Sequence, residues 1–118
     1  LTGLPVKAGN DANMAALGEA WKGGAVGCGN MVLATFGTGV GGGVIINGKI
    51  FAGGVNFSGT ELGHTVLVSG GRQCTCGRRG CWEAYSSATA LSKMTKEKMT
   101  EDEKKEIYRA IECVLRGR

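Results

Sequence analysis

The sequence contains a single proline, a single histidine and no long hydrophobic run among its 118 residues. Without such a run, no segment resembles a transmembrane helix or a signal peptide. The net charge is only +4, and acidic residues are interleaved with the basic ones, so the charge gives no argument for nucleic-acid binding. We therefore expect neither a membrane nor a nucleic acid as a partner of this chain.

In contrast to proline, glycine is abundant. The chain has 22 glycines, and they are concentrated between Gly23 and Gly80. Valine, isoleucine, leucine and phenylalanine alternate with these glycines, so the segment predicts turns and ligand-contacting loops within a folded domain. A chain of this length can bury one core. Because it does not begin with methionine, we expect it to be a piece of a longer protein.

The histidine and three of the five cysteines lie close together, as His64, Cys74, Cys76 and Cys81. Imidazole and thiolate are ligands that Zn²⁺ prefers, and structural zinc sites take four of them in a tetrahedron. Disulfides or buried thiols are the alternatives, although Cys74 and Cys76 are separated by one residue and are poorly placed to bridge each other. We call residues 64–81 the cysteine loop and predict a structural zinc site in it.

Charge and cysteine usage agree with this prediction. Three thiolates around a dication leave a net charge of minus one, and Arg72, Arg78 and Arg79 in the same loop can offset it. The two other cysteines, Cys28 and Cys113, are more typical of a reducing cytoplasm than of a secreted disulfide framework. We expect a cytoplasmic protein.

The residues around the loop resemble the signature of the ROK family (repressors, open reading frames, sugar kinases). Its pattern Glu-x-Gly-His followed by Cys-x-Cys-Gly-x-x-Gly-Cys-x-Glu stands here at residues 61–64 and 74–83. The resemblance extends upstream through GNDANMAALGEAW and FGTGVGGGVIINGKI. We expect two regions, a ROK sugar-kinase core fragment at residues 1–92 and a charged amphipathic helical tail at residues 93–118.

The resemblance implies an α/β fold, specifically a fragment of an actin-like (ribonuclease H-like) ATPase lobe with a zinc-binding loop. It also implies an ATP-dependent hexokinase of the glucokinase type that uses Mg²⁺, phosphorylates a hexose and forms a homo-oligomer such as a dimer. A sugar-responsive transcriptional regulator of the same family and a non-enzymatic zinc module are the alternatives. The family's first phosphate loop, Asp-x-Gly-Gly-Thr, and its later adenosine region do not occur in this sequence, so we expect the isolated chain to be inactive.

The resemblance also places the residues of a sugar site. Asp11 corresponds to the catalytic base, which would accept the proton of the attacking sugar hydroxyl. Asn10, Asp11, Glu61, His64 and Glu83 would bind the sugar, with one histidine nitrogen on zinc and the other facing a hydroxyl. Without the family, Asn10 and Asp11 are typical of a helix cap, and a pair of carboxylates is also found in glycosidases.

A glycine-rich segment follows a predicted strand at residues 31–36 and begins with Gly37, Thr38 and Gly39. Glycines let backbone N–H groups approach phosphate oxygens, and Thr38 adds a hydroxyl donor. The segment lacks the lysine of a P-loop, and such a run is also how a hairpin turns. The resemblance implies that these three residues contact the phosphates of ATP.

Periodicity and turn residues predict the remaining elements. Asn47-Gly48 favours a tight hairpin turn, and Thr100 with Glu103 forms a capping-box pattern. The expected elements are a helix over 11–21, hairpin strands over 43–46 and 49–52, a strand over 65–68, a helix from Cys81 past Leu91, and a final helix with an apolar stripe at Ile107, Ala110, Ile111, Val114 and Leu115.

Overall fold

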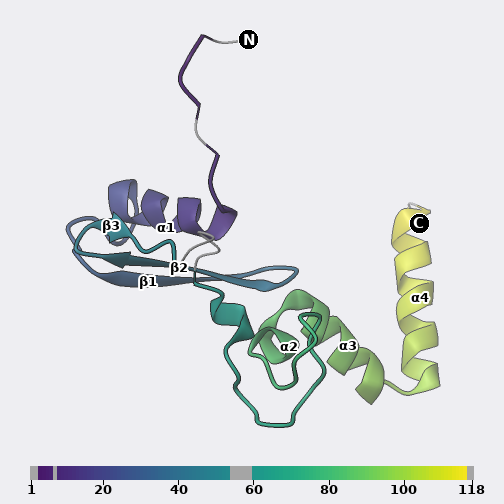
Figure 1. The fold of residues 1–118 in the computed structure, drawn as a ribbon. Coiled ribbons are helices and arrows are strands. Elements are labelled where there is room, and N and C mark those ends of the chain that lie inside the picture. Colours follow the sequence, from purple (N-terminus) through teal and green to yellow (C-terminus); the bar gives the residue numbers. More distant parts are fainter. Residues whose placement is uncertain (1–2, 7, 54–59, 117–118) are drawn as a thin grey trace.

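The structure, a computed structural model, describes residues 3–6, 8–53 and 60–116. A small sheet with one helix on it is followed by the cysteine loop and by three further helices (Figure 1). The elements are α1 (Asp11–Lys22), β1 (Met31–Phe36), β2 (Val40–Ile46), β3 (Lys49–Ile50), the 3-10 helix η1 (Leu62–His64), α2 (Glu83–Ser86), α3 (Ala88–Lys98) and α4 (Glu101–Leu115). The predicted first helix and first strand are confirmed.

The three strands form an antiparallel sheet in the order β1-β2-β3. Phe36 lies opposite Val40, and Ile45 lies opposite Ile50. The turn between β2 and β3 has positive φ angles of 51° at Asn47 and 72° at Gly48, as the predicted tight turn requires. The second strand begins at Val40, three residues earlier than predicted, because Val40 and the glycines that follow it also pair with β1.

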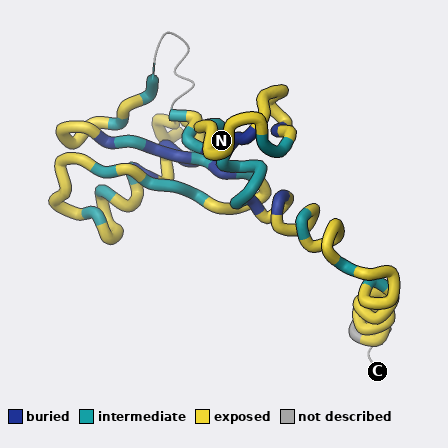
Figure 2. The backbone as a smooth tube through the Cα atoms, turned by 90° about the horizontal axis from the view of Figure 1, so that it is seen from below, coloured by how far each residue is buried: buried dark blue, intermediate teal, exposed yellow. Residues whose placement is uncertain are grey.

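Helix α1 packs on β2 through small residues. The Asn10 side chain caps the helix by accepting a hydrogen bond from the backbone N–H of Asn13 at 3.1 Å. Ala12 and Ala16 are buried beneath it, and a Cβ atom at Gly43 of β2 would lie only 2.6 Å from the Ala16 Cβ. The buried residues accordingly concentrate along the central strand and the helix facing it (Figure 2).

Helix α3 is fixed to the hairpin turn between β1 and β2. The N–H of Ala88 donates to the Gly37 carbonyl, and the Thr89 hydroxyl donates to the Thr38 carbonyl, each at 2.8 Å. The predicted single helix from Cys81 past Leu91 is wrong, because it divides at Ser87, which has extended backbone and caps α3 through its hydroxyl. This division directs the N-terminus of α3 toward the turn.

The predicted strand over residues 65–68 is also wrong. Val66 forms one isolated bridge with Cys81, and the N–H groups of Leu67 and Val68 both donate to the same Gly80 carbonyl. Two donors on one acceptor give a turn-like loop, whereas a strand needs a ladder of separate acceptors.

Helix α4 points away from the sheet (Figure 1). The predicted capping box is present, since the Glu103 carboxylate accepts from the Thr100 N–H at 2.8 Å. Ile107 and Ile111 of the predicted apolar stripe are each 49% exposed. Within the ranges that the structure describes, no helix has the length and apolar character needed to cross a membrane.

Candidate functional site

The cysteine loop brings the four predicted metal ligands together. The ligand atoms of His64, Cys74, Cys76 and Cys81 all lie within 4.8 Å of one another. Cys74, Cys76 and Cys81 form no disulfide, so the alternative of a disulfide in this loop is wrong for this structure. Cys74 and Cys81 are buried, His64 is half-buried and Cys76 is exposed.

The separations match those of a tetrahedral zinc site. The sulfurs of Cys76 and Cys81 are 3.7 Å apart, and the Cys74 sulfur lies 3.5 Å from His64 Nδ1. Ordinary zinc–sulfur and zinc–nitrogen bonds in a tetrahedron require a sulfur–sulfur edge of about 3.8 Å and a sulfur–nitrogen edge of about 3.6 Å. The donor set and its geometry therefore fit a metal ion with four protein ligands.

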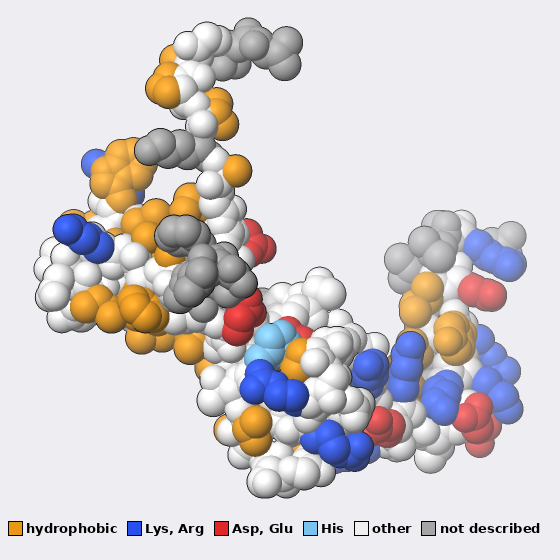
Figure 3. All heavy atoms as spheres, viewed as in Figure 1, with side chains coloured by type: hydrophobic (Ala, Val, Ile, Leu, Met, Phe, Trp, Pro, Cys, Tyr) orange, Lys and Arg blue, Asp and Glu red, His pale blue; other side chains and the backbone are white. Residues whose placement is uncertain are grey.

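The loop backbone is tightly folded around the cluster. Gly80 has a φ of 83°, and a Cβ atom there would collide with the Val68 carbonyl, so only glycine fits. The Arg72 N–H donates to the Tyr85 hydroxyl at 2.8 Å, which ties the loop to α2. Figure 3 shows the histidine at the junction of the sheet and the loop, with acidic side chains beside it and basic ones over the loop.

Only one of the three arginines of the loop acts on the thiols. Hydrogen bonds from the Arg78 backbone and side chain lower the pKa of Cys76 to about 6, whereas burial raises the pKa of Cys81 to about 11. Arg72 instead pairs with Glu97 at 2.7 Å, and Arg79 donates to the Gly71 carbonyl. Burial thus favours the neutral thiol at Cys81, so a cation is needed to hold its thiolate.

Asn10, Asp11 and Glu61 line one small cavity of about 130 Å³ at the N-terminus of α1. Gly41 and Gly42 of β2 also line it. The structure thus brings together three of the residues predicted for the sugar site, from segments fifty residues apart in the sequence. Thr60 also lines this cavity and donates to the Gly42 carbonyl at 3.4 Å, a residue that the sequence analysis did not select.

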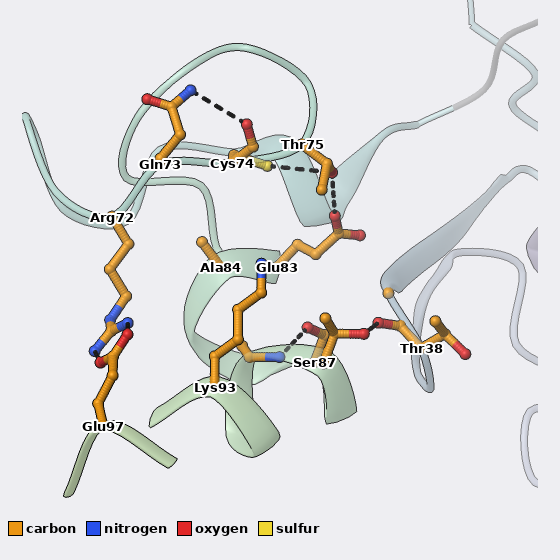
Figure 4. A pocket seen from close by; sticks show the side chains of 13 residues that line it. Thr38, Arg72, Gln73, Cys74, Thr75, Glu83, Ala84, Ser87, Lys93 and Glu97 are labelled. Atoms are coloured by element: carbon orange, nitrogen blue, oxygen red, sulfur yellow. Dashed lines mark hydrogen bonds and ion pairs between the residues drawn. The ribbon is translucent and has the colours of Figure 1, made fainter. Parts of the chain in front are cut away.

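Glu83 lies in a second, larger cavity of about 410 Å³, between the hairpin turn, the cysteine loop and α3 (Figure 4). Its carboxylate accepts from the Val40 N–H at 2.9 Å and from the Thr75 hydroxyl at 3.3 Å. Thr38 and Gly39 line the same cavity, while Gly37 is held in the turn by its hydrogen bond to Gly39. Glu83 is therefore separated from the Asp11 cavity in this structure and links the cysteine loop to the turn.

Thr75 was missed by the sequence analysis, although it stands between two of the predicted ligands. When both cysteines of a Cys-x-Cys pair bind a metal, the residue between them is fixed in position. The place of Thr75 between Cys74 and Cys76 was therefore the feature of the sequence that could have identified it. Its hydrogen bond to a carboxylate eight residues later follows only from the folded loop.

The model of the ROK family matches residues 1–114. A glucokinase of Halalkalibacterium halodurans is 50% identical over 107 residues, which cover 90% of this chain and 32% of that protein. A xylose repressor of Bacillus spizizenii is 46% identical over 97 residues, covering 80% of this chain and 25% of the repressor. The chain spans about a third of the length of the glucokinase it matches.

The fold is also similar to that of a crystal structure of a ROK family glucokinase from Streptomyces griseus in complex with glucose and AMPPNP. The TM-score is 0.71 at 44% identity, over 81% of this chain and 30% of the other. The predicted fold class, part of an actin-like α/β lobe with a metal-binding cysteine loop, is confirmed by this similarity and by the ligand cluster. The family match also includes much of the segment after residue 92, for which the sequence motifs gave no resemblance.

Proposed function

The chain belongs to the ROK family, and we propose that the protein containing it is an ATP-dependent hexokinase of the glucokinase type. The observation that carries this proposal is the cavity in which Asn10, Asp11 and Glu61 meet over two glycines of β2. It offers a carboxylate base, an amide and a second carboxylate around a space that part of a sugar can enter. Thr38 and Gly39 line the larger cavity, and Gly39 stands two residues before Gly41 of the first cavity, so a phosphate donor has a place nearby.

Asp11 would act as the base. It is the first residue of α1, is exposed, and accepts a hydrogen bond from the Ala12 N–H at 2.8 Å through one carboxylate oxygen. The other oxygen can receive the proton of the sugar hydroxyl as that oxygen bonds to the γ-phosphorus of ATP. Asn10 and Glu61 would hold neighbouring hydroxyls and so orient the sugar.

His64 and the three cysteines would hold a structural Zn²⁺. When bound, the ion braces the loop and supplies no open coordination position, because four protein ligands complete the tetrahedron. Since Nδ1 of His64 faces the Cys74 sulfur, the outer nitrogen Nε2 is left as a fixed N–H donor for a sugar hydroxyl. Glu83, which lines the larger cavity, would accept a further hydroxyl.

Gly37, Thr38 and Gly39 would contact the phosphates of ATP, which arrive with Mg²⁺. We further propose a homo-oligomer, such as a dimer, in the cytoplasm. The kinase assignment supports this proposal, and so do Cys74, Cys76 and Cys81, which form a metal-ligand cluster and no disulfide.

The test is ATP consumption by the full-length protein with Mg²⁺ across a panel of hexoses, with zinc content measured on the same sample. We expect turnover with at least one hexose and one zinc per chain. Asp11→Asn should lower kcat about 10²–10⁴-fold, since it removes the base but keeps the shape. The matched control is Asp102→Asn, because Asp102 is an exposed acid on α4 that lines neither cavity, and it should leave kcat unchanged.

A sugar-responsive transcriptional regulator is the second candidate, favoured by the 46% identity to a xylose repressor. Sugar binding and stoichiometric zinc without ATP turnover would support this regulator and exclude the kinase.

A further inference from the structure

The acidic residues assigned so far to the sugar and to phosphoryl transfer are not balanced by any assigned lysine or arginine. Asp11, Glu61 and Glu83 are all carboxylates, while a transferring phosphoryl group carries negative charge that a cation must neutralise. Mg²⁺ meets part of this need. Kinases commonly add a lysine or arginine that contacts the phosphates directly, and the glycine-rich turn of this chain contains none.

The cavity beside the turn contains two basic side chains, Arg72 and Lys93, and two acidic ones, Glu83 and Glu97. Arg72 is already neutralised, because its guanidinium forms two hydrogen bonds with the Glu97 carboxylate, at 3.2 and 2.7 Å. The Glu83 carboxylate is held by Val40 and Thr75. Among the residues that the structure describes, Lys93 makes no ion pair, and Figure 4 shows it extending from α3 into the cavity toward Glu83.

The position of Lys93 relative to the turn is fixed by the backbone. The first turn of α3 donates two hydrogen bonds, to the carbonyls of Gly37 and Thr38. Lys93 lies one helical turn beyond Thr89 and so projects from the same face of α3. A cation therefore lines the same cavity as Thr38 and Gly39, the proposed phosphate contacts.

A short stretch of chain connects this cavity to the one that Asp11 lines. Gly39 lines the first and Gly41 lines the second. Two residues of a strand span about 7 Å, so a polyphosphate at the turn can direct its terminal group toward the Asp11 cavity.

We propose that Lys93 binds the polyphosphate of the nucleotide and positions it against the turn at residues 37–39. This inference rests on the proposed kinase function and adds to it the cation that the motif residues lack. Lys93 forms no covalent bond and moves no proton; it is a positioning residue whose charge acts on the phosphate oxygens.

The experiment measures equilibrium binding of Mg·AMPPNP to the full-length protein by calorimetry, together with the KM values for ATP and for the hexose. Lys93→Gln removes the charge at similar length, and Lys93→Arg keeps it. The control Lys96→Gln makes the same charge change on an exposed residue of the same helix that does not line the cavity.

We expect Lys93→Gln to weaken Mg·AMPPNP binding and to raise the KM for ATP about tenfold, the worth of one charge-assisted hydrogen bond. The KM for the hexose should stay unchanged, Lys93→Arg should recover most of the loss, and Lys96→Gln should match the wild type. The difference between wild type and Lys93→Gln should shrink as salt is raised, because an exposed charge is screened.

Two outcomes would overturn the proposal and are distinguishable from each other. If Lys93→Gln binds Mg·AMPPNP as tightly as the wild type while hexose is still phosphorylated, the assignment of Lys93 fails and the kinase function stands. If the wild type neither binds Mg·AMPPNP nor turns over any hexose, the kinase function fails and the role of Lys93 fails with it.

Discussion

Replacing Gly43 by alanine tests the close packing of α1 on β2, on which the position of Asp11 depends. The added Cβ atom would lie 2.6 Å from the Ala16 Cβ and 2.9 Å from the Ala12 carbonyl oxygen. Carbon atoms in contact normally lie about 3.5–4.0 Å apart, so the helix must move away by about 1 Å. One of the two obstacles is helix backbone, which no side-chain rotation can relieve.

Overpacking of this kind costs about 1–3 kcal/mol. Alanine also restricts the unfolded chain relative to glycine, which returns about 0.4–1 kcal/mol. We therefore expect Gly43→Ala to lower the free energy of unfolding by about 1–2 kcal/mol. The matched control is Gly18→Ala on the exposed side of α1, where a Cβ atom meets nothing within 4 Å. That variant should raise the free energy of unfolding by about 0.5–1 kcal/mol, since glycine is a poor helix former.

The assay is urea unfolding of the full-length protein in zinc-containing buffer, with the midpoint and the slope both measured. A second variant pair sharpens the result. Ala16→Gly removes the nearer obstacle, so the double variant with Gly43→Ala should be less unstable than the sum of the two single changes. If Gly43→Ala is as stable as Gly18→Ala, or if the double variant shows no coupling, the argument that glycine permits this packing is refuted.

The metal site gives two further predictions. Cys81→Ala removes one of four ligands, and a quarter of the about 10–16 kcal/mol typical of structural zinc is about 2.5–4 kcal/mol, which predicts about 100- to 1,000-fold weaker zinc binding. In the same metal analysis, Cys28→Ala should retain one zinc per chain. Because burial raises the pKa of Cys81 to about 11, zinc must displace the thiol proton at pH 7.5. The affinity for zinc should therefore fall as the pH falls. Calorimetry in buffers of different ionisation enthalpy should show at least one proton released per zinc bound. Binding without proton release would contradict the assignment of Cys81 as a thiolate ligand.

Local patterns predicted the first half of the fold well. The alanine-rich helix, the apolar strand at residues 31–36 and the Asn47-Gly48 turn each depend on residues near one another in sequence, and the structure has all three. The two wrong elements depend on distant partners. Ser87 interrupts a helical pattern because the next N–H bonds to Gly37, and residues 65–68 form no strand because their donors converge on Gly80.

In the candidate site, too, the features that depend on sequence neighbours could be predicted and those that depend on distant contacts could not. Ligand spacing alone was enough to predict the cluster of His64 and the three cysteines, because the residue types that bind zinc can be identified directly from the sequence. Spacing could not predict that Glu83 would lie in a different cavity from Asp11, since that depends on how the cysteine loop folds against the hairpin. The same holds for Lys93, which has no motif around it and becomes notable only because α3 is fixed to the turn.

Under the proposed function, Glu83 would let a structural metal act on a sugar that the metal does not touch. A carboxylate can accept about four hydrogen bonds, and Val40 and Thr75 already occupy one oxygen each. Each oxygen therefore keeps capacity for a sugar hydroxyl, and its direction is set by the two donors. One donor belongs to the strand that leaves the hairpin turn, and the other stands between two ligands of the cluster. Loss of the metal would free Thr75, and Glu83 would then lose one of the two hydrogen bonds that orient its carboxylate. The affinity for sugar should therefore depend on zinc through this hydrogen bond, although neither Thr75 nor Glu83 is a metal ligand.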